Sequence, residues 1–209
     1  MSAEKPRERP ILFNDQMVRA ILEGRKTVTR RVVKDTGFYA IDAAIHGNDV
    51  ALREREALST RCPYGEPGDR LWVRETWGLQ VRSYGGGAGE FIDYRATNPD
   101  AIYCRSSEGR EYPVKWKPSI HMHRHSSRIL LEITAVRVER LQDISEEQAL
   151  AEGVRGEPCD HARQACSDIG CWGDTAKGAF GFLWEQLNGA GAWQANPWVW
   201  VVEFKRVTP

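Results

Sequence analysis

Residues 24–31 read Gly-Arg-Lys-Thr-Val-Thr-Arg-Arg, and in this stretch a helix is expected to end and a basic strand to begin. Asn14 can cap a short helix before it, because apolar residues recur there at three- and four-residue spacing, namely Met17, Val18, Ile21 and Leu22. Gly24 is a natural left-handed stop for that helix. Residues 27–29 favour extended backbone. The sequence therefore predicts a helix, a glycine stop and a strand, with Lys26 held at a fixed place between them.

The same stretch concentrates positive charge in an otherwise neutral protein. Five basic residues fall within ten positions, namely Arg25, Lys26, Arg30, Arg31 and Lys34. This density suits the binding of a phosphate or a polar anionic ligand. The alternative is a solvated basic turn followed by two strand threonines.

Further strands are indicated by alternation of apolar and polar residues. Residues 71–77 alternate like a half-buried strand that follows a Pro-Gly-Asp turn at 67–69. The glycine triplet 85–87 indicates a hairpin tip and not a phosphate loop, because neither a Lys-Ser pair nor a helix follows it. Residues 129–140 form a long expected strand whose alternation changes phase, which a β-bulge near Thr134 would repair. A last strand is expected over 198–207.

Two more helices are indicated in the second half of the chain. Ser145 and Gln148 have the spacing of a capping box, and that helix should end at Gly153. Another helix has apolar residues at helical spacing before a stop at Gly189, namely Phe180, Leu183, Trp184 and Leu187. These aromatics are expected to be mostly core. Trp193 is a candidate for stacking on a ligand, with a packed loop tryptophan as the alternative.

Length, charge and hydropathy limit the classes of protein to consider. The 209 residues are enough for one domain with a good core, or for one domain with insertions. Lys plus Arg and Asp plus Glu are 29 each, so nucleic-acid binding would need a local patch. Neither a membrane-length apolar run nor a signal-peptide core is present, so we expect a cytoplasmic protein without a membrane partner. The sequence does not indicate an oligomeric state.

A group of zinc-compatible residues lies between positions 159 and 171. It offers four candidate ligands, Cys159, His161, Cys166 and Cys171, which are enough for a tetrahedral structural zinc site. Their spacing differs from the common CxxC pairs, and free thiols in a loop are the alternative. The remaining two cysteines, Cys62 and Cys104, are expected to be small packed residues.

A second basic stretch spans residues 115–128. Lys115, Trp116 and Lys117 place an aromatic side chain between two lysines, a combination that suits phosphate contact and base stacking with single-stranded RNA. Three histidines at alternate positions, His121, His123 and His125, would share one face of an extended chain, so they are candidate ligands for a metal site.

Three segments together resemble the ASCH domain family, which shares the PUA-like β-barrel. They are residues 24–31, residues 67–75 (Pro-Gly-Asp-Arg-Leu-Trp-Val-Arg-Glu) and the Trp-Val-Trp-Val-Val-Glu-Phe strand at 198–204. The likeness runs in order from Pro10 to Val207 and is strongest to the larger ASCH proteins of phages and prophages. It implies an α+β fold, a PUA-like mixed β-barrel with short flanking helices. It also implies a single domain over 1–209, with insertions at about 35–61, 78–112 and 155–177.

The resemblance also implies an activity. ASCH proteins that hydrolyse N4-acetylcytidine use a lysine, a threonine and a glutamate, which align with Lys26, Thr29 and Glu152. In that scheme the threonine attacks the amide carbonyl, the lysine accepts its proton and the glutamate acts as acid toward the leaving cytosine amine. The expected activity is therefore amide hydrolysis of an N4-acylated cytidine-type nucleoside, without a catalytic cofactor.

Other residues are expected to bind the nucleoside or RNA. The resemblance places Arg74 or Glu75 near the cleft and matches the family pattern at three positions of the second basic stretch. The expected set is Arg25, Arg30, Arg31, Arg74, Glu75, Lys115, Trp116, Lys117, His121, Arg124 and Arg128. Two alternatives stay open: an RNA-binding PUA-like module without catalysis, and a ribonuclease that uses the same basic cleft.

Overall fold

The computed structural model of the protein describes residues 6–33, 62–155 and 175–208. The four candidate zinc ligands, Cys159, His161, Cys166 and Cys171, lie outside these ranges, as does the expected insertion at 35–61. Within the described ranges there is no group of three or more His, Cys, Asp or Glu side chains that could hold a metal ion. None of the helices in those ranges has the length and apolarity that crossing a membrane requires.

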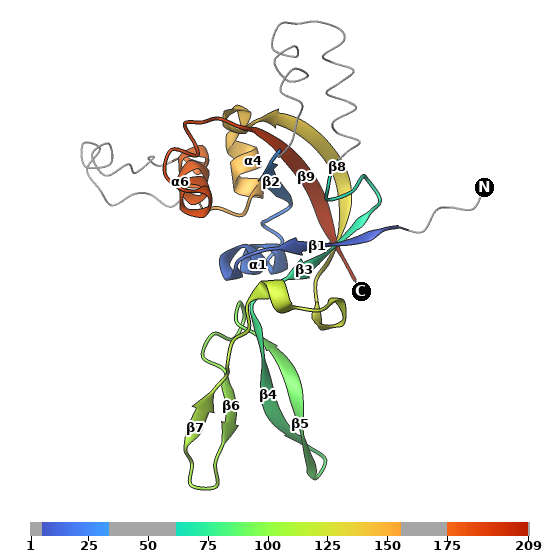
Figure 1. The fold of residues 1–209 in the computed structure, drawn as a ribbon, viewed down its shortest axis with the longest axis vertical. Coiled ribbons are helices and arrows are strands. Elements are labelled where there is room, and N and C mark those ends of the chain that lie inside the picture. The colour runs from blue at the N-terminus through green and yellow to red at the C-terminus, as the bar shows by residue number, and fades with distance from the viewer. Residues whose placement is uncertain (1–5, 34–61, 156–174, 209) are drawn as a thin grey trace, which may run out of the picture.

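A five-stranded sheet forms the centre of the molecule (Figure 1). Its strands, in spatial order, are β1 (Glu8–Leu12), β3 (Arg70–Arg74), β8 (Leu130–Arg140), β9 (Trp198–Val207) and β2 (Val28–Val32). β1 and β3 are parallel, and the other pairs are antiparallel. The α+β class is therefore confirmed. Over the described ranges the sheet is open, with β1 and β2 at its edges, and is not closed into a barrel.

The phase change expected in the long strand is present in β8. The register between β8 and β9 shifts between Ile133, which pairs with Phe204, and Ala135, which pairs with Glu203. This bulge keeps apolar residues on the buried face on both sides of the shift, and Ile133 and Val138 are each at most 2% exposed. The predicted bulge is confirmed.

Two helices begin, and three helices end, at residues that the sequence indicates. Asn14 Oδ1 accepts a hydrogen bond from the Met17 amide at 2.8 Å and caps α1 (Asp15–Leu22). Ser145 and Gln148 form the capping box of α4 (Glu146–Ala151), and α6 (Ala176–Asn188) ends at Gly189. The described ranges also contain three short 3₁₀ helices: η1 (Ser119–His121), η2 (Arg124–Ser126) and η3 (Leu141–Asp143).

Two hairpins extend away from the sheet (Figure 1). The first joins β4 (Trp77–Tyr84) to β5 (Gly87–Tyr94), and the second joins β6 (Ile102–Arg105) to β7 (Glu111–Pro113). Gly85 and Gly86 both have positive φ, as the tight two-residue turn requires. The predicted single strand over 71–77 is two strands, because the chain leaves the central sheet after Arg74 and starts the hairpin at Trp77.

Both faces of the sheet are covered. In β9, Trp200, Val202 and Phe204 belong to the cluster that packs on α1, whereas Val199 and Val201 belong to the cluster that packs on α4 and α6. This division follows from the two-residue period of a strand. The second cluster holds α4 and α6 beside β2 (Figure 1).

Candidate functional site

Lys26 occupies the link between α1 and β2. Its backbone amide donates to Ala20 O at 3.0 Å, and the amide of Thr27 donates to Ala151 O at 2.8 Å. Lys26 therefore precedes the strand, which begins at Val28. The alternation of side chains along a strand does not apply to it, so Lys26 and Thr29 are not forced to opposite faces.

The ammonium group of Lys26 is buried and fully hydrogen-bonded. Nζ donates to Val28 O at 2.8 Å, to Glu152 O at 2.8 Å and to Glu152 Oε2 at 2.6 Å. The side chain has no exposed surface. Burial lowers the pKa of Lys26 below its ordinary value, the Glu152 carboxylate opposes this shift, and the cations of Arg31 and Arg30 add to it.

Glu152, the partner of Lys26, lies at the end of α4. It is the C-cap of that helix, and Gly153 follows with φ +90°. A Cβ on Gly153 would lie 2.7 Å from the Cβ of Ala20 and 3.0 Å from the Cβ of Lys26. Glycine is therefore required here for two reasons, its positive φ and the close approach of α1 and Lys26.

Arg30 joins the same buried network. Its NH1 lies 3.2 Å from Glu152 Oε1, and its NH2 donates to Glu139 Oε1 at 2.6 Å and to Gln148 Oε1 at 2.8 Å. The side chain has no exposed surface. Arg30 was expected to bind a ligand phosphate, but its charge is already balanced by two carboxylates, so its first role in the structure is to orient Glu152.

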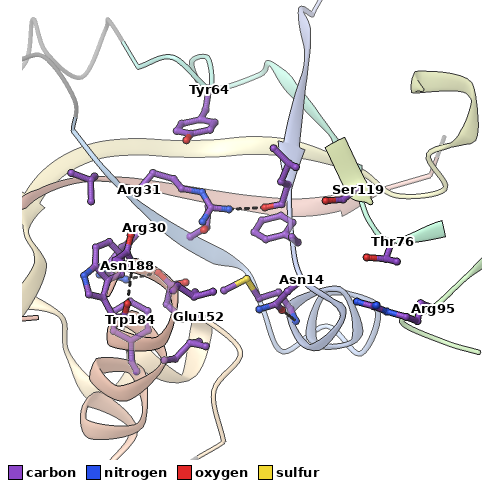
Figure 2. Close-up of a pocket in the computed structure, with 18 residues that line it drawn as sticks. Asn14, Arg30, Arg31, Tyr64, Thr76, Arg95, Ser119, Glu152, Trp184 and Asn188 are labelled. Carbon is purple, nitrogen blue, oxygen red and sulfur yellow. Dashed lines mark hydrogen bonds and ion pairs between the residues drawn. The ribbon is translucent and has the colours of Figure 1, made fainter. Parts of the chain in front are cut away.

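A cavity of about 530 Å³ lies beside this network (Figure 2). Its polar wall includes Thr29, Arg30, Arg31 and Glu152. The rest is lined by Leu12, Phe13, Asn14, Met17, Val32, Tyr64, Thr76, Arg95, Ser119, Phe180, Leu183, Trp184, Leu187 and Asn188. Thr29 is 1% exposed. Lys26 is not among the lining residues, but its ammonium group contacts Glu152, which does line the cavity.

The structure therefore brings Lys26, Thr29 and Glu152 together at one site. Lys26 and Glu152 form the buried ion pair, and Thr29 and Glu152 share the cavity wall. A carboxylate and a hydroxyl in the wall of one partly apolar cavity, with a buried lysine bonded to that carboxylate, are groups that covalent and acid–base chemistry on a neutral substrate requires.

The other expected binding residues near β2 and β3 are engaged with the protein. Arg31 lines the cavity, and its NH2 donates to Leu12 O at 2.8 Å. Glu75 is 1% exposed and binds Arg128 through two hydrogen bonds of 2.9 Å each. Burial raises the pKa of Glu75, and Arg128 opposes that shift. Arg128 also lies 4.0 Å from the centre of the Tyr94 ring, and Arg74 lies 5.3 Å from that of Trp72.

Most of the second basic stretch lies away from the cavity. Of residues 115–128, Ser119 is the one that lines it. Lys115 and Lys117 line a separate groove of about 580 Å³ formed by the two hairpins. Arg124 binds Glu8 at 2.6 Å, while Trp116 and His121 do not line the cavity. At the first basic stretch, Arg25 binds Glu23 and donates to Gly153 O at 2.8 Å. The basic side chains of the second stretch therefore do not line the cavity that Arg30 and Arg31 line.

Sequence reasoning did not identify part of the cavity wall. Phe180 and Trp184 are buried as predicted, at 3% and 4% exposure, yet they also face the cavity from α6 together with Asn188. Trp193, the candidate for stacking, is instead packed edge-on against Phe180 with ring centres 6.2 Å apart. Glu139, the partner of Arg30, could not be recognised from the sequence around Arg30, because it lies far away in the chain on β8.

No family model matches the chain, and no curated protein or solved structure gives a significant match. The likeness to the ASCH family consequently rests on the three sequence segments. These segments form β2, β3 and β9, which are strands of the same five-stranded sheet.

Proposed function

We propose that this protein is an amidohydrolase that acts on an N4-acylated cytidine-type nucleoside. The observation that carries the proposal is the buried Lys26–Glu152 pair, 2.6 Å apart, next to a cavity that Thr29 also lines. The cavity volume of about 530 Å³ suits a nucleoside-sized ligand. The ASCH resemblance supports the same three residues, and with it we propose a PUA-like fold.

The protonation state of the buried pair explains how one site can supply both a base and an acid. All three N–H bonds of the Lys26 ammonium point at oxygen atoms, so it must lose a proton before it can accept one. Transfer of a proton from Nζ to Glu152 Oε2, across 2.6 Å, produces a neutral amine and a carboxylic acid. Burial assists this transfer because it disfavours the ammonium form and so lowers the pKa of Lys26.

The reaction then proceeds by acyl transfer. Thr29 Oγ1 attacks the amide carbonyl carbon, and the Lys26 amine takes the hydroxyl proton. The carbon–nitrogen bond breaks as the Glu152 carboxylic acid gives its proton to N4, so cytidine leaves and an ester remains on Thr29. Water then cleaves the ester, which releases the carboxylic acid and restores the Thr29 hydroxyl. The Arg30 contact to Glu152 Oε1 leaves Oε2 for the proton transfer.

The binding-module and ribonuclease alternatives receive less support. Polynucleotide binding by the expected residues would need exposed cations along one path, and Arg30, Arg124 and Arg128 are each paired with a carboxylate. A nucleoside carries no phosphate, so the pairing of these arginines does not oppose its binding.

The proposal is tested by measuring release of cytidine from N4-acetylcytidine by the purified protein. We expect turnover that Thr29→Ala lowers by at least about a thousandfold, because the nucleophile is lost. Thr76→Ala is a matched control, since Thr76 is the other threonine among the residues that line the cavity, and it should retain most of the activity. Undiminished activity of Thr29→Ala, or release of fragments from labelled RNA without any cytidine, would contradict the proposal.

A further inference from the structure

Two buried N–H groups at the cavity wall have no hydrogen-bond acceptor. They are Nε1 of Trp184 and Nε of Arg30, and within the described part of the chain neither atom has a partner. Trp184 is 4% exposed and Arg30 is 2% exposed. Buried donors are normally satisfied, so an unpaired N–H group in a cavity wall suggests that a ligand supplies the acceptor.

Both donors belong to the same wall of the cavity. Arg30 and Trp184 line it, and the Phe180 ring connects them. The guanidinium carbon of Arg30 lies 5.9 Å from the centre of that ring, and the Phe180 and Trp184 ring centres are 6.0 Å apart. Figure 2 shows Arg30 and Trp184 in the same part of the cavity, with Glu152 beside them.

The hydrogen-bonding groups of this wall are complementary to an amide. The unpaired donors can bind a carbonyl oxygen, and the Glu152 carboxylate can accept a hydrogen bond from an amide N–H. An N4-acylated cytosine presents both groups on one amide bond, the acyl oxygen and the N4 hydrogen, whereas cytidine lacks the acyl oxygen.

We propose that the Trp184 indole N–H, assisted by Nε–H of Arg30, binds the acyl carbonyl oxygen of the ligand. This assignment deepens the proposed function by naming the group that distinguishes acylated from free cytidine. During attack by Thr29 that oxygen gains negative charge, and a donor fixed in a buried wall stabilises the charge without rearrangement.

The test separates carbonyl binding from turnover. In a Thr29→Ala background, which removes the nucleophile, affinities for N4-acetylcytidine and for cytidine are measured by calorimetry with and without Trp184→Phe. We expect Trp184→Phe to weaken N4-acetylcytidine binding roughly tenfold and to leave cytidine binding unchanged. Trp198→Phe is the matched control, because the Trp198 indole N–H is also buried without a partner but Trp198 does not line the cavity.

A second substitution removes the N–H group while keeping the shape of the ring. Benzothienylalanine incorporated at position 184 has sulfur in place of the indole nitrogen, and it should cause the same selective loss even if Trp184→Phe fails to fold. Equal weakening of both ligands, or none, would overturn the assignment, as would failure of the Thr29→Ala protein to bind either ligand. A selective loss in a protein whose wild type does not release cytidine would refute the hydrolase proposal and leave carbonyl recognition supported.

Discussion

Lys26 Nζ lies 2.6 Å from Glu152 Oε2, although the two residues are 126 positions apart in the chain. The pair joins the link after α1 to the end of α4, and both side chains are at most 3% exposed. A charge pair at this depth is stable only when each partner makes further hydrogen bonds. Here Lys26 donates to Val28 O, and Arg30 donates to Glu152.

Removal of the Glu152 charge should strongly destabilise the protein. Glu152→Gln leaves the ammonium of Lys26 buried without its carboxylate, and we expect the free energy of unfolding to fall by about 3–5 kcal/mol. Glu132→Gln is the control, since it breaks an ion pair with Lys205 whose lysine side chain is 61% exposed, and it should cost at most about 1 kcal/mol. Urea unfolding of the two variants measures both values, and equal losses would contradict the structural importance of the buried pair.

The lowered pKa of Lys26 predicts how stability depends on pH. Between that lowered pKa and the ordinary value of 10.5, the folded state binds fewer protons at Lys26 than the unfolded state. The free energy of unfolding should therefore gain a contribution that rises with pH across this window and is complete above 10.5. Below the window both states are protonated, and the cost of burying the charge is fully present.

The contribution of Lys26 is isolated by comparing wild type with Lys26→Met at each pH. Burial raises the pKa values of Tyr64 and Tyr94, which lowers stability as the unfolded-state tyrosines ionise at alkaline pH. Both proteins share this effect, so it cancels in the difference. The free energy of unfolding of wild type minus that of Lys26→Met should rise with pH, and a flat or falling difference would be incompatible with a lowered Lys26 pKa.

Gly153→Ala should disturb the site through the backbone. The added Cβ would meet Ala20 at 2.7 Å and Lys26 at 3.0 Å, and the φ of +90° is unfavourable for alanine. Gly109→Ala is matched for backbone strain, because Gly109 has φ +84° and open space around its Cβ position. We expect Gly153→Ala to lower the free energy of unfolding by about 1–3 kcal/mol more than Gly109→Ala does. Thermal and urea unfolding measure the difference, and equal costs would show that the contact with Lys26 is unimportant.

Local signals in the sequence predicted most of the secondary structure. The Asn14 cap, the Ser145–Gln148 capping box and the β8 bulge each depend on residues close together in the chain, so they could be recognised without tertiary information. The burial of Arg30 could not, because a basic residue in a basic run normally faces water. Its burial depends on Glu139, which lies 109 positions away on β8.

The residues of the cavity wall could likewise be predicted only in part from the sequence. Lys26, Thr29 and Glu152 were all assigned as site residues through the family resemblance, whereas residues 24–31 alone indicated a basic stretch suited to an anionic ligand. Another part of the wall comes from α6, whose aromatic residues have the spacing of an ordinary core helix. Their second role depends on how α6 packs beside β2, and periodicity does not contain that information.

The pairing of the arginines leads to a final prediction about RNA. Affinity for a polynucleotide falls with salt in proportion to the number of phosphates that the protein neutralises, with a slope of about −0.7 per phosphate for single strands. Arg30 is buried with two carboxylates, Arg128 is held by Glu75, and Arg124 is held by Glu8. We therefore expect a short single-stranded RNA to bind weakly, with a slope of log affinity against log salt near zero. N4-acetylcytidine binding should be equally insensitive to salt, since the ligand has no phosphate. Fluorescence anisotropy of labelled RNA at several salt concentrations measures the slope. The control is Arg206→Ala, which changes an exposed residue at the end of β9. A steep slope that Arg31→Ala and Arg128→Ala each reduce by about 0.7, while Arg206→Ala does not, would place a phosphate path across both basic segments and favour the RNA-binding alternative.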